Sequence, residues 1–335
     1  MQTKLSLNKH GFIRHCSTFT NLLSTYFYVH FEISQYNSCD LVSIDLAKAF
    51  DKVPKDILIS KLQCFGIDSK LVNLIYIILT NRKQQVKIEN IISDMLPVTS
   101  GVPQGSQLSP LLFINFIYDL FKLDLSSKII GFADDLKLVN SSAKNLANDL
   151  LKIAHKVNIN GMSINVEKCT VIHFGAKNSK YTYSINSKII TSTSQIRDLG
   201  ILVDDDLKFS SQLDALKMKS YRTINIIIKF FKIRNAILFK RLYKIYVLPI
   251  ILYCLPIYFT NTRGCINGIE KIQKYFTRRL YKLIYKAALC PKYSDRLKLF
   301  NLVSLDSLCK KRFARFVFCD KRLHSHSFRT FFKYT

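Results

Sequence analysis

The sequence predicts an α+β fold that is followed by a basic, all-helical part. Up to about residue 206, short apolar runs bounded by turn residues are interspersed with amphipathic helical stretches. Beyond that residue the apolar positions recur at helical spacing. The charge changes at the same place, because residues 207–335 hold 28 Lys and Arg against 5 Asp and Glu, whereas residues 1–206 hold 22 against 18. We therefore expect two parts with a boundary near residue 206.

The net charge of +27 limits the classes of partner. A strongly basic half indicates a polyanion, and nucleic acid is favoured over an anionic membrane surface. The most apolar run, Tyr246–Phe259, contains two prolines and is shorter than the roughly 20 residues that span a bilayer. The nine cysteines form no Cys-x-x-Cys pair and lie near no His at zinc spacing. We therefore expect reduced intracellular thiols, no structural zinc, no signal peptide and no membrane anchor.

The elements of the first part follow from periodicity and turn residues. A helix is expected over Phe19–Phe31, and a buried strand over Leu41–Ile44. Further helices are expected over Lys55–Phe65, Ser69–Leu79 and Leu111–Phe121 and, capped by Ser142, up to about Asn158. The remaining strands are a hairpin of Gln84–Ile92 with Met95–Thr99, then Ser163–Val166, Thr170–Phe174, Tyr181–Ile185, Lys188–Ile190 and Arg197–Val203. The second part contains predicted helices over Gln212–Arg234, Ala236–Val247 and Ile269–Tyr285.

Two acidic positions stand at the edges of apolar strands. In the stretch Lys128–Val139, apolar runs flank Asp134 and Asp135 at a tight turn, and Asp45 directly follows the strand that ends at Ile44. Asp is also an ordinary turn residue, because its side chain bonds nearby backbone N–H groups. If the two strands are neighbours in one sheet, however, the carboxylates converge, and such a cluster suits Mg²⁺ with substrate phosphates. Two such ions can support in-line phosphoryl transfer.

A loop rich in turn residues precedes the predicted buried helix. The stretch Ser100–Pro110 contains two glycines and Pro103, and Ser109 with Pro110 forms a typical helix start. A Gly-rich loop that leads into a helix N-terminus suits a phosphate group. A capped turn before a core helix is the alternative interpretation.

Four stretches in this order resemble the reverse transcriptase of non-LTR (LINE-type) retrotransposons: Ile44–Asp51, Gly101–Ser106, Phe132–Asp135 and Asn165–Lys168. The basic part resembles the jockey and CR1 group in Leu199–Asp204, Leu242–Pro249 and Ile269–Arg278. The resemblance extends from about residue 9 to 322.

The resemblance implies a right-hand polymerase fold with partial fingers. Residues 1–39 would be a remnant of truncated fingers, and 40–206 would be the palm, with inserted fingers elements near 66–100. Residues 207–290 would be a helical thumb, and 291–335 a basic C-terminal tail.

The resemblance also implies the roles of individual residues. Asp45, Asp134 and Asp135 would bind two catalytic Mg²⁺ ions, with Mn²⁺ as the alternative, and Leu46 would offer its backbone carbonyl to a metal. Lys168 matches the lysine that acts as general acid toward the leaving pyrophosphate, although a solvated lysine is the alternative there.

The nucleotide site would be formed by Leu46 together with three further residues. Phe50 would exclude ribonucleotides by a clash with the 2′-OH, or else simply pack in the core. Gln104 and Gly105 would border the incoming nucleotide and the template base. Cys16 stands where the family has an arginine.

The function implied is that of an RNA-directed DNA polymerase, which extends a DNA 3′-OH on an RNA template with dNTPs. Its location would be the nucleus or a cytoplasmic ribonucleoprotein. The alternative is a catalytically inactive truncated copy that retains only nucleic-acid binding.

Overall fold

The computed structural model describes residues 8–231, 234–259, 262–286 and 289–319. The chain divides into two compact units, Met1–Ile196 and Arg197–Thr335. The boundary between the units therefore lies about ten residues before the change of charge near residue 206.

The first unit is built on a sheet with the strand order β11-β8-β1-β7-β6. These strands are Thr191–Ser192 (β11), Thr170–Phe174 (β8), Cys39–Ile44 (β1), Asp135–Asn140 (β7) and Lys128–Phe132 (β6). All neighbours are antiparallel except β11, which runs parallel to β8. The central strand β1 is buried almost throughout, as its apolar sequence requires when both faces of the sheet are covered.

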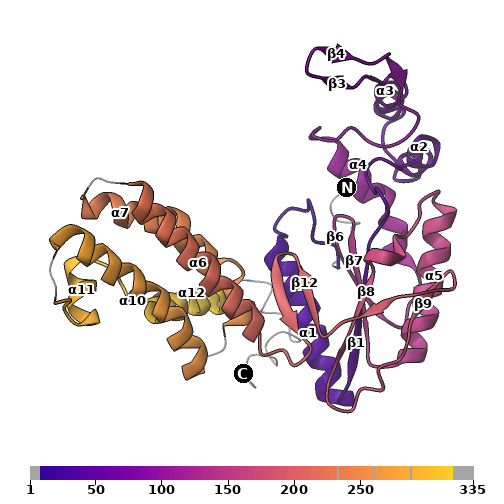
Figure 1. Ribbon diagram of the computed structural model, residues 1–335. Helices are drawn as coiled ribbons and strands as arrows, with labels where there is room; N and C mark the ends of the chain where they lie inside the picture. The colour runs from indigo at the N-terminus through magenta and orange to yellow at the C-terminus, as the bar shows by residue number, and fades with distance from the viewer. Residues whose placement is uncertain (1–7, 232–233, 260–261, 287–288, 320–335) are drawn as a thin grey trace. The chain divides into compact units, whose positions relative to one another are not determined.

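Helices cover both faces of this sheet, which is seen nearly edge-on in Figure 1. Helix α1 (Thr18–Tyr36) packs on one face, and α5 (Ala143–Ile159) packs on the other. Ser17 caps α1 through a reciprocal capping box, and Ser142 caps α5 as predicted. The result is an α+β fold, which confirms the predicted fold class.

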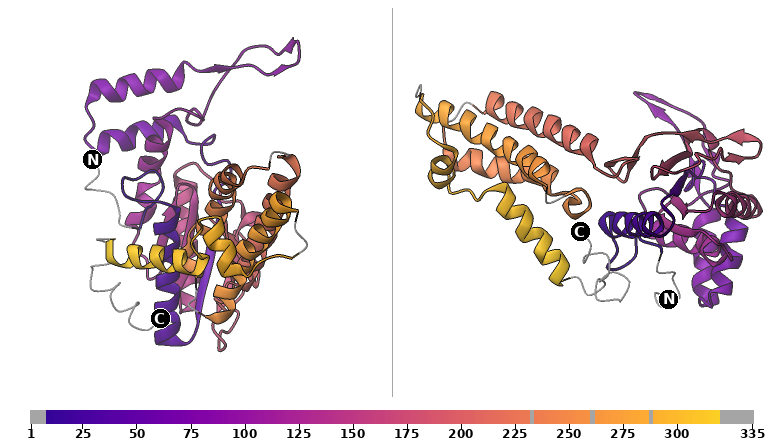
Figure 2. Two further views of the ribbon diagram at one scale, coloured as in Figure 1. Left: turned by 90° about the vertical axis from the view of Figure 1, so that its left-hand side faces the viewer. Right: turned by 90° about the horizontal axis from the view of Figure 1, so that it is seen from below.

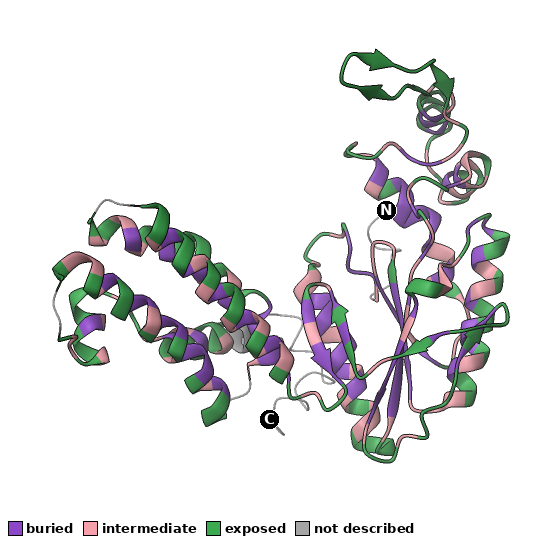
Figure 3. Ribbon diagram, in the orientation of Figure 1, coloured by how far each residue is buried: buried purple, intermediate pink, exposed green. Residues whose placement is uncertain are grey.

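The main hydrophobic core lies on the face of the sheet that α5 covers and extends into the helices that follow β1 and precede β6. These are α2 (Lys55–Cys64), α3 (Ser69–Thr80) and α4 (Ser109–Phe116), followed by the 3-10 turn η2 (Tyr118–Lys122). Figure 3 shows the buried residues concentrated along the sheet and on the inner faces of these helices. The predicted helix Leu111–Phe121 is thus correct in place but changes to a 3-10 turn before its end.

The segment after α3 is a narrow ribbon that projects from the unit (Figure 2). It consists of β2 (Lys83–Gln84) paired with β5 (Leu96–Pro97), and β3 (Lys87–Ile88) paired with β4 (Ile91–Ile92). The predicted single strand Gln84–Ile92 is wrong, because the chain reverses at Glu89, where φ is 52°. Apolar β-branched residues on both sides of this turn concealed it in the sequence.

Of the strands predicted after α5, Thr170–Phe174 is confirmed with its predicted bounds as β8, whereas others are shorter or absent. Ser163–Val166 is not a strand, since it makes a single bridge from Ile164 to Leu46 and then enters the 3-10 turn η3 (Val166–Lys168). The pair β9 (Ser184–Ile185) and β10 (Lys188–Ile189) forms a hairpin whose two turn residues both have positive φ, a geometry typical of type I′ turns.

Another hairpin crosses the boundary between the two units in the sequence. The predicted single strand Arg197–Val203 is in fact part of two strands, β12 (Gln195–Asp198) and β13 (Ile201–Asp204). Leu199 and Gly200 form the turn with φ of 42° and 88°. Glycine is favoured at such a position because it has no Cβ to clash in the left-handed region.

Helices form the rest of the second unit. They are α6 (Ser210–Phe230), α7 (Ala236–Leu242), the π-helical turn η4 (Tyr243–Val247), α8 (Leu248–Leu252), α9 (Leu255–Tyr258), α10 (Arg263–Tyr285), α11 (Tyr293–Leu299) and α12 (Leu305–Cys319). Helices α6 and α10 pack together, and the rings of Tyr243 and Phe276 stack in the core with centroids 4.2 Å apart.

Two of these helices lie in the region predicted to be a basic tail. Both α11 and α12 pack against α10, so this region contributes to the second unit as far as the structure describes it. The run Tyr246–Phe259 is divided among η4, α8 and α9. Within the described ranges, no helix is both long and apolar enough to cross a membrane.

Candidate active site

The register of β1 and β7 brings two of the predicted acidic positions together. Ile44, the last residue of β1, is paired with Leu136 near the start of β7. Because the pairing is antiparallel, continuing it by one residue sets Asp45 opposite Asp135. The condition that the sequence left open, that these two strands be neighbours, is therefore met.

The tight turn predicted at the acidic pair lies between β6 and β7. Phe132 pairs with Asp135, so Ala133 and Asp134 are the two turn residues, and Ala133 has a φ of 54°. The N-terminal segment runs along the outer edge of β6, where His10 N–H donates to the Gly131 carbonyl at 2.9 Å.

Gly11 allows this segment to approach the turn closely. A Cβ at residue 11 would lie 2.3 Å from the backbone nitrogen of Ala133, so any other residue would push the segment away from the turn. Sequence reasoning did not identify Gly11 as a support of the acidic turn.

The electrostatics of the turn link Asp134 to Asp45. Burial raises the pKa of the Asp134 carboxyl above its usual range, and the negative charge of Asp45 raises it further. Both side chains are half-buried, whereas Asp135 is exposed. A carboxyl whose ionisation is disfavoured by burial and by a neighbouring negative charge is suited to a cation placed beside it.

The protein groups alone do not complete a metal site. Among the described residues, no group of three or more His, Cys, Asp or Glu side chains is close enough to hold a metal ion. The pair of carboxylates nevertheless provides hard oxygen donors, which suit Mg²⁺ when substrate phosphates and water supply the remaining ligands. The donor set therefore fits a divalent ion that binds together with a substrate.

A short segment after α5 supports the residues that follow β1. Asn165 N–H donates to the Asp45 carbonyl at 2.9 Å, and Leu46 forms its bridge with Ile164. Lys168 ends the 3-10 turn η3 of the same segment and is exposed. The structure thus places Lys168 three residues from a backbone partner of Asp45.

Phe50 and the loop after the ribbon are joined through the backbone. Val102 N–H donates to the Phe50 carbonyl at 2.8 Å, and the Phe50 ring stacks on Phe113 with centroids 4.6 Å apart. Gln104 Nε2 donates to Asp51 Oδ1 at 2.8 Å, and Gly105 follows in an exposed turn. The predicted nucleotide-site residues Phe50, Gln104 and Gly105 therefore lie in two connected segments.

Arg82 is a supporting residue that sequence reasoning missed. Its Nη2 donates to the Ser100 carbonyl at 3.0 Å and also to the carbonyl of Gly101, so it holds the start of the loop. The sequence around Arg82 contains no signal for this role, because a basic residue at the end of a helix is common.

A mostly antiparallel sheet thus presents carboxylates from a strand end and from the adjoining hairpin. Residues 2–203 match the family of reverse transcriptases (RNA-dependent DNA polymerases). The chain therefore belongs to this family, and the predicted family and fold class are confirmed.

Curated relatives come from retrotransposons. The chain is 26% identical over 213 residues to the Pol polyprotein of retrotransposable element R2 of Popillia japonica, which covers 58% of this chain and 34% of the relative. It is 26% identical over 309 residues to the probable RNA-directed DNA polymerase from transposon BS of Drosophila melanogaster, covering 86% of this chain and 33% of the relative.

A third relative is the RNA-directed DNA polymerase from mobile element jockey of Drosophila funebris. It is 25% identical over 260 residues, which cover 71% of this chain and 28% of the relative. The chain thus spans about a third of the length of these curated relatives. Among solved structures, the telomerase of Candida tropicalis in complex with a fragment of telomeric RNA aligns with a TM-score of 0.48 at 10% identity, covering 98% of this chain and 53% of that one.

Proposed function

We propose that the chain is an RNA-directed DNA polymerase that extends a DNA 3′-OH on an RNA template. The observation that carries the proposal is the convergence of Asp45 and Asp134 at the end of β1 and the β6–β7 turn, in a chain of the reverse transcriptase family. Reverse transcriptases use divalent metal ions, and two Mg²⁺ ions, or Mn²⁺ instead, are the cofactor proposed here.

Asp45 and Asp134 would hold the ions, together with Asp135 and the backbone carbonyl of Leu46. When bound, the ions would stabilise the attacking and leaving oxygens of an in-line phosphoryl transfer. The chain itself contributes position and charge. Asp134 is held by a two-residue turn that is supported by Gly11, and the register of β1 with β7 sets Asp45 opposite Asp135, the next residue. The contact with Asn165 fixes the backbone of Asp45.

Four further residues have proposed roles toward the nucleotide. Phe50 would exclude a 2′-OH, and its stacking on Phe113 would stiffen it for that role. Gln104 and Gly105 would border the incoming nucleotide and the template base. Lys168 is exposed and attached to the segment that bonds Asp45, which supports its role as a proton donor to the leaving pyrophosphate.

The second unit would bind the template–primer duplex, as a thumb does. Helix α10 buries Ile272, Phe276 and Leu280, so its cations are left on the outer surface. These exposed cations are Lys271, Lys274, Arg278, Arg279, Lys282 and Lys286. A row of positive charge with no acidic residue between Lys271 and Lys286 favours contact with phosphates.

Primer extension tests the proposal. The chain is incubated with an RNA template, a DNA primer, dNTPs and Mg²⁺, and is compared with Asp134→Asn and with Asp56→Asn, an exposed acid on α2. Loss of metal binding should reduce incorporation by at least about a hundredfold in Asp134→Asn only. Equal incorporation by all three proteins would refute the catalytic assignment. Salt-sensitive but Mg²⁺-independent RNA binding without extension would support the alternative, a nucleic-acid binder without activity.

A further inference from the structure

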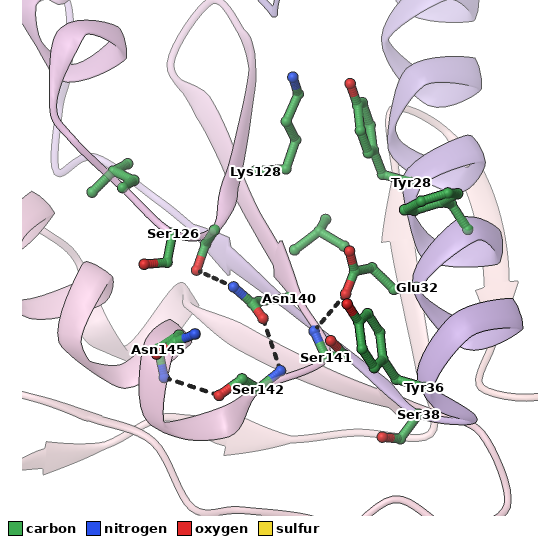
Figure 4. A pocket seen from close by; sticks show the side chains of 14 residues that line it. Tyr28, Glu32, Tyr36, Ser38, Ser126, Lys128, Asn140, Ser141, Ser142 and Asn145 are labelled. Atoms are coloured by element: carbon green, nitrogen blue, oxygen red, sulfur yellow. Dashed lines mark hydrogen bonds between the residues drawn. The ribbon is translucent and has the colours of Figure 1, made fainter. Parts of the chain in front are cut away.

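A pocket of about 820 Å³ lies at the opposite end of the β6–β7 hairpin from the acidic turn. Figure 4 shows it between α1 on one side and the ends of β6 and β7 with the start of α5 on the other. Lys128 begins β6, five residues before the turn, and at about 3.4 Å per residue the two sites are roughly 17 Å apart. The pocket is therefore separate from the candidate active site.

One wall of the pocket is aromatic. Tyr28, Phe31 and Tyr36 are spaced at helical intervals along one side of α1. Phe31 is 49% exposed and Tyr36 is 63% exposed, although large aromatic side chains are costly to leave in water. A row of accessible rings beside a cavity offers stacking surfaces for a flat ligand.

The ammonium group of Lys128 lies beside the same aromatic wall. The Lys128 ammonium lies 4.5 Å from the centroid of the Tyr28 ring, and Figure 4 shows both side chains at one end of the pocket. This contact orients the cation without neutralising its charge. An anionic group that enters here would meet a pre-positioned positive charge.

The floor of the pocket is polar and ordered. Glu32 accepts a hydrogen bond from Ser141 N–H at 3.1 Å, and Asn140 Oδ1 accepts one from Ser142 N–H at 2.8 Å. Asn140 Nδ2 donates to Ser127 Oγ at 3.2 Å. A carboxylate has about four acceptor sites, so Glu32 keeps capacity for a ligand's N–H donors. Its negative charge disfavours a phosphate at the floor and favours an amino group there.

From these contacts we propose that the pocket binds one unpaired nucleotide of a single-stranded nucleic acid, with an amino-bearing base. The base stacks against the tyrosines of α1, its amino group donates to Glu32, and its phosphate pairs with Lys128. The combination of an aromatic wall, one cation and an acceptor at the floor matches the three parts of a nucleotide. A free inorganic anion would use only Lys128 and would be repelled by Glu32.

A simple affinity measurement would be dominated by nucleic-acid binding to the basic second unit. Photocrosslinking instead reports which residues contact the nucleotide, so it tests the pocket itself. The full chain is irradiated with a labelled oligouridine that contains a single 5-iodocytidine, in RNA and in DNA form, and crosslinked peptides are mapped by mass spectrometry. We expect crosslinks at Tyr28 or Tyr36. Comparison of the crosslink yields of the RNA and DNA probes identifies whether RNA or DNA supplies the nucleotide.

Variants at exposed positions make the test specific. Loss of one stacking contact in Tyr36→Ala should reduce the crosslink yield at least about fivefold, whereas Tyr76→Ala, an exposed tyrosine on α3, should leave it unchanged. Glu32→Gln should reduce the preference for 5-iodocytidine over 5-iodouridine. Circular dichroism establishes that each variant is folded.

Two results would overturn the inference. One is the absence of crosslinks in residues 28–36 at saturating oligonucleotide, and the other is equal yield for the cytidine and uridine probes. The inference and the proposed polymerase activity can fail separately. Asp134→Asn should abolish primer extension while it retains the crosslink.

Discussion

Lys9 is a buried cation whose removal should change how the free energy of unfolding depends on pH. Only 4% of the residue is exposed, its Nζ donates to the Ile114 carbonyl, and the Phe121 ring centroid lies 5.1 Å from Nζ. Burial lowers the pKa of the Lys9 ammonium from 10.5 to about 7; the negative charge of Asp119 opposes this shift and Lys61 adds to it. The folded chain therefore prefers the neutral amine.

The size and sign of the effect follow from this difference in pKa. Below pH 7 both states carry the proton, and the folded state bears the full cost of the buried charge. Between about pH 7 and 10.5 the unfolded state binds one proton more than the folded state, so the free energy of unfolding rises with pH. At about 1.4 kcal/mol per pH unit, the gain between pH 6 and pH 9 is about 2–3 kcal/mol.

Urea unfolding followed by circular dichroism at pH 6 and pH 9 measures this gain. Lys9→Met has no titrating group at the site, so its free energy of unfolding should lack this rise. Lys122→Met removes an exposed lysine that lies over the Tyr118 ring nearby and should behave as the parent chain does. The same dependence on pH in the parent chain and in Lys9→Met would refute the reasoning.

Two further changes test the packing of the sheet. Tyr183→Phe removes the hydroxyl that donates to the buried carboxylate of Asp40. It should lower the free energy of unfolding, measured by urea titration, by about 1.5–3 kcal/mol. No change would mean that this hydrogen bond is not formed in solution. A Cβ at Gly131 would lie 2.5 Å from the Phe121 ring, so Gly131→Ala should cost about 1–3 kcal/mol by the same assay. Gly264→Ala meets no atom within 4 Å and should not destabilise the chain, and equal effects of the two substitutions would contradict the steric argument.

Local sequence signals were sufficient for most helices. The stripe of Leu146, Leu150, Ile153 and Val157 predicts one face of α5, and all four side chains are buried. Ser142 caps that helix as predicted, since a hydroxyl that accepts a backbone N–H is a local interaction. Predictions of this kind depend only on residues within a few positions of one another.

The turns inside apolar runs could not be predicted in the same way. Glu89 lies in a run of β-branched residues, and Leu199 precedes a single glycine, so apolar residues flank both reversals closely. The structure has two short strands in each place, because cross-strand pairing depends on contacts between separate segments. Periodicity along one segment does not contain that information.

The carboxylates and cations of the candidate site could be recognised from the sequence. It placed Asp45 at a strand end, Asp134 at a tight turn and a row of positive charge on α10, since each depends on local pattern and composition. That β1 lies beside β7, and hence that Asp45 lies opposite the acidic pair, is a property of the tertiary structure. The tertiary structure also places Glu32 and Lys128 in the lining of one pocket. Both juxtapositions join segments about ninety residues apart in the chain, and the packing of α1 and α5 on the sheet selects them.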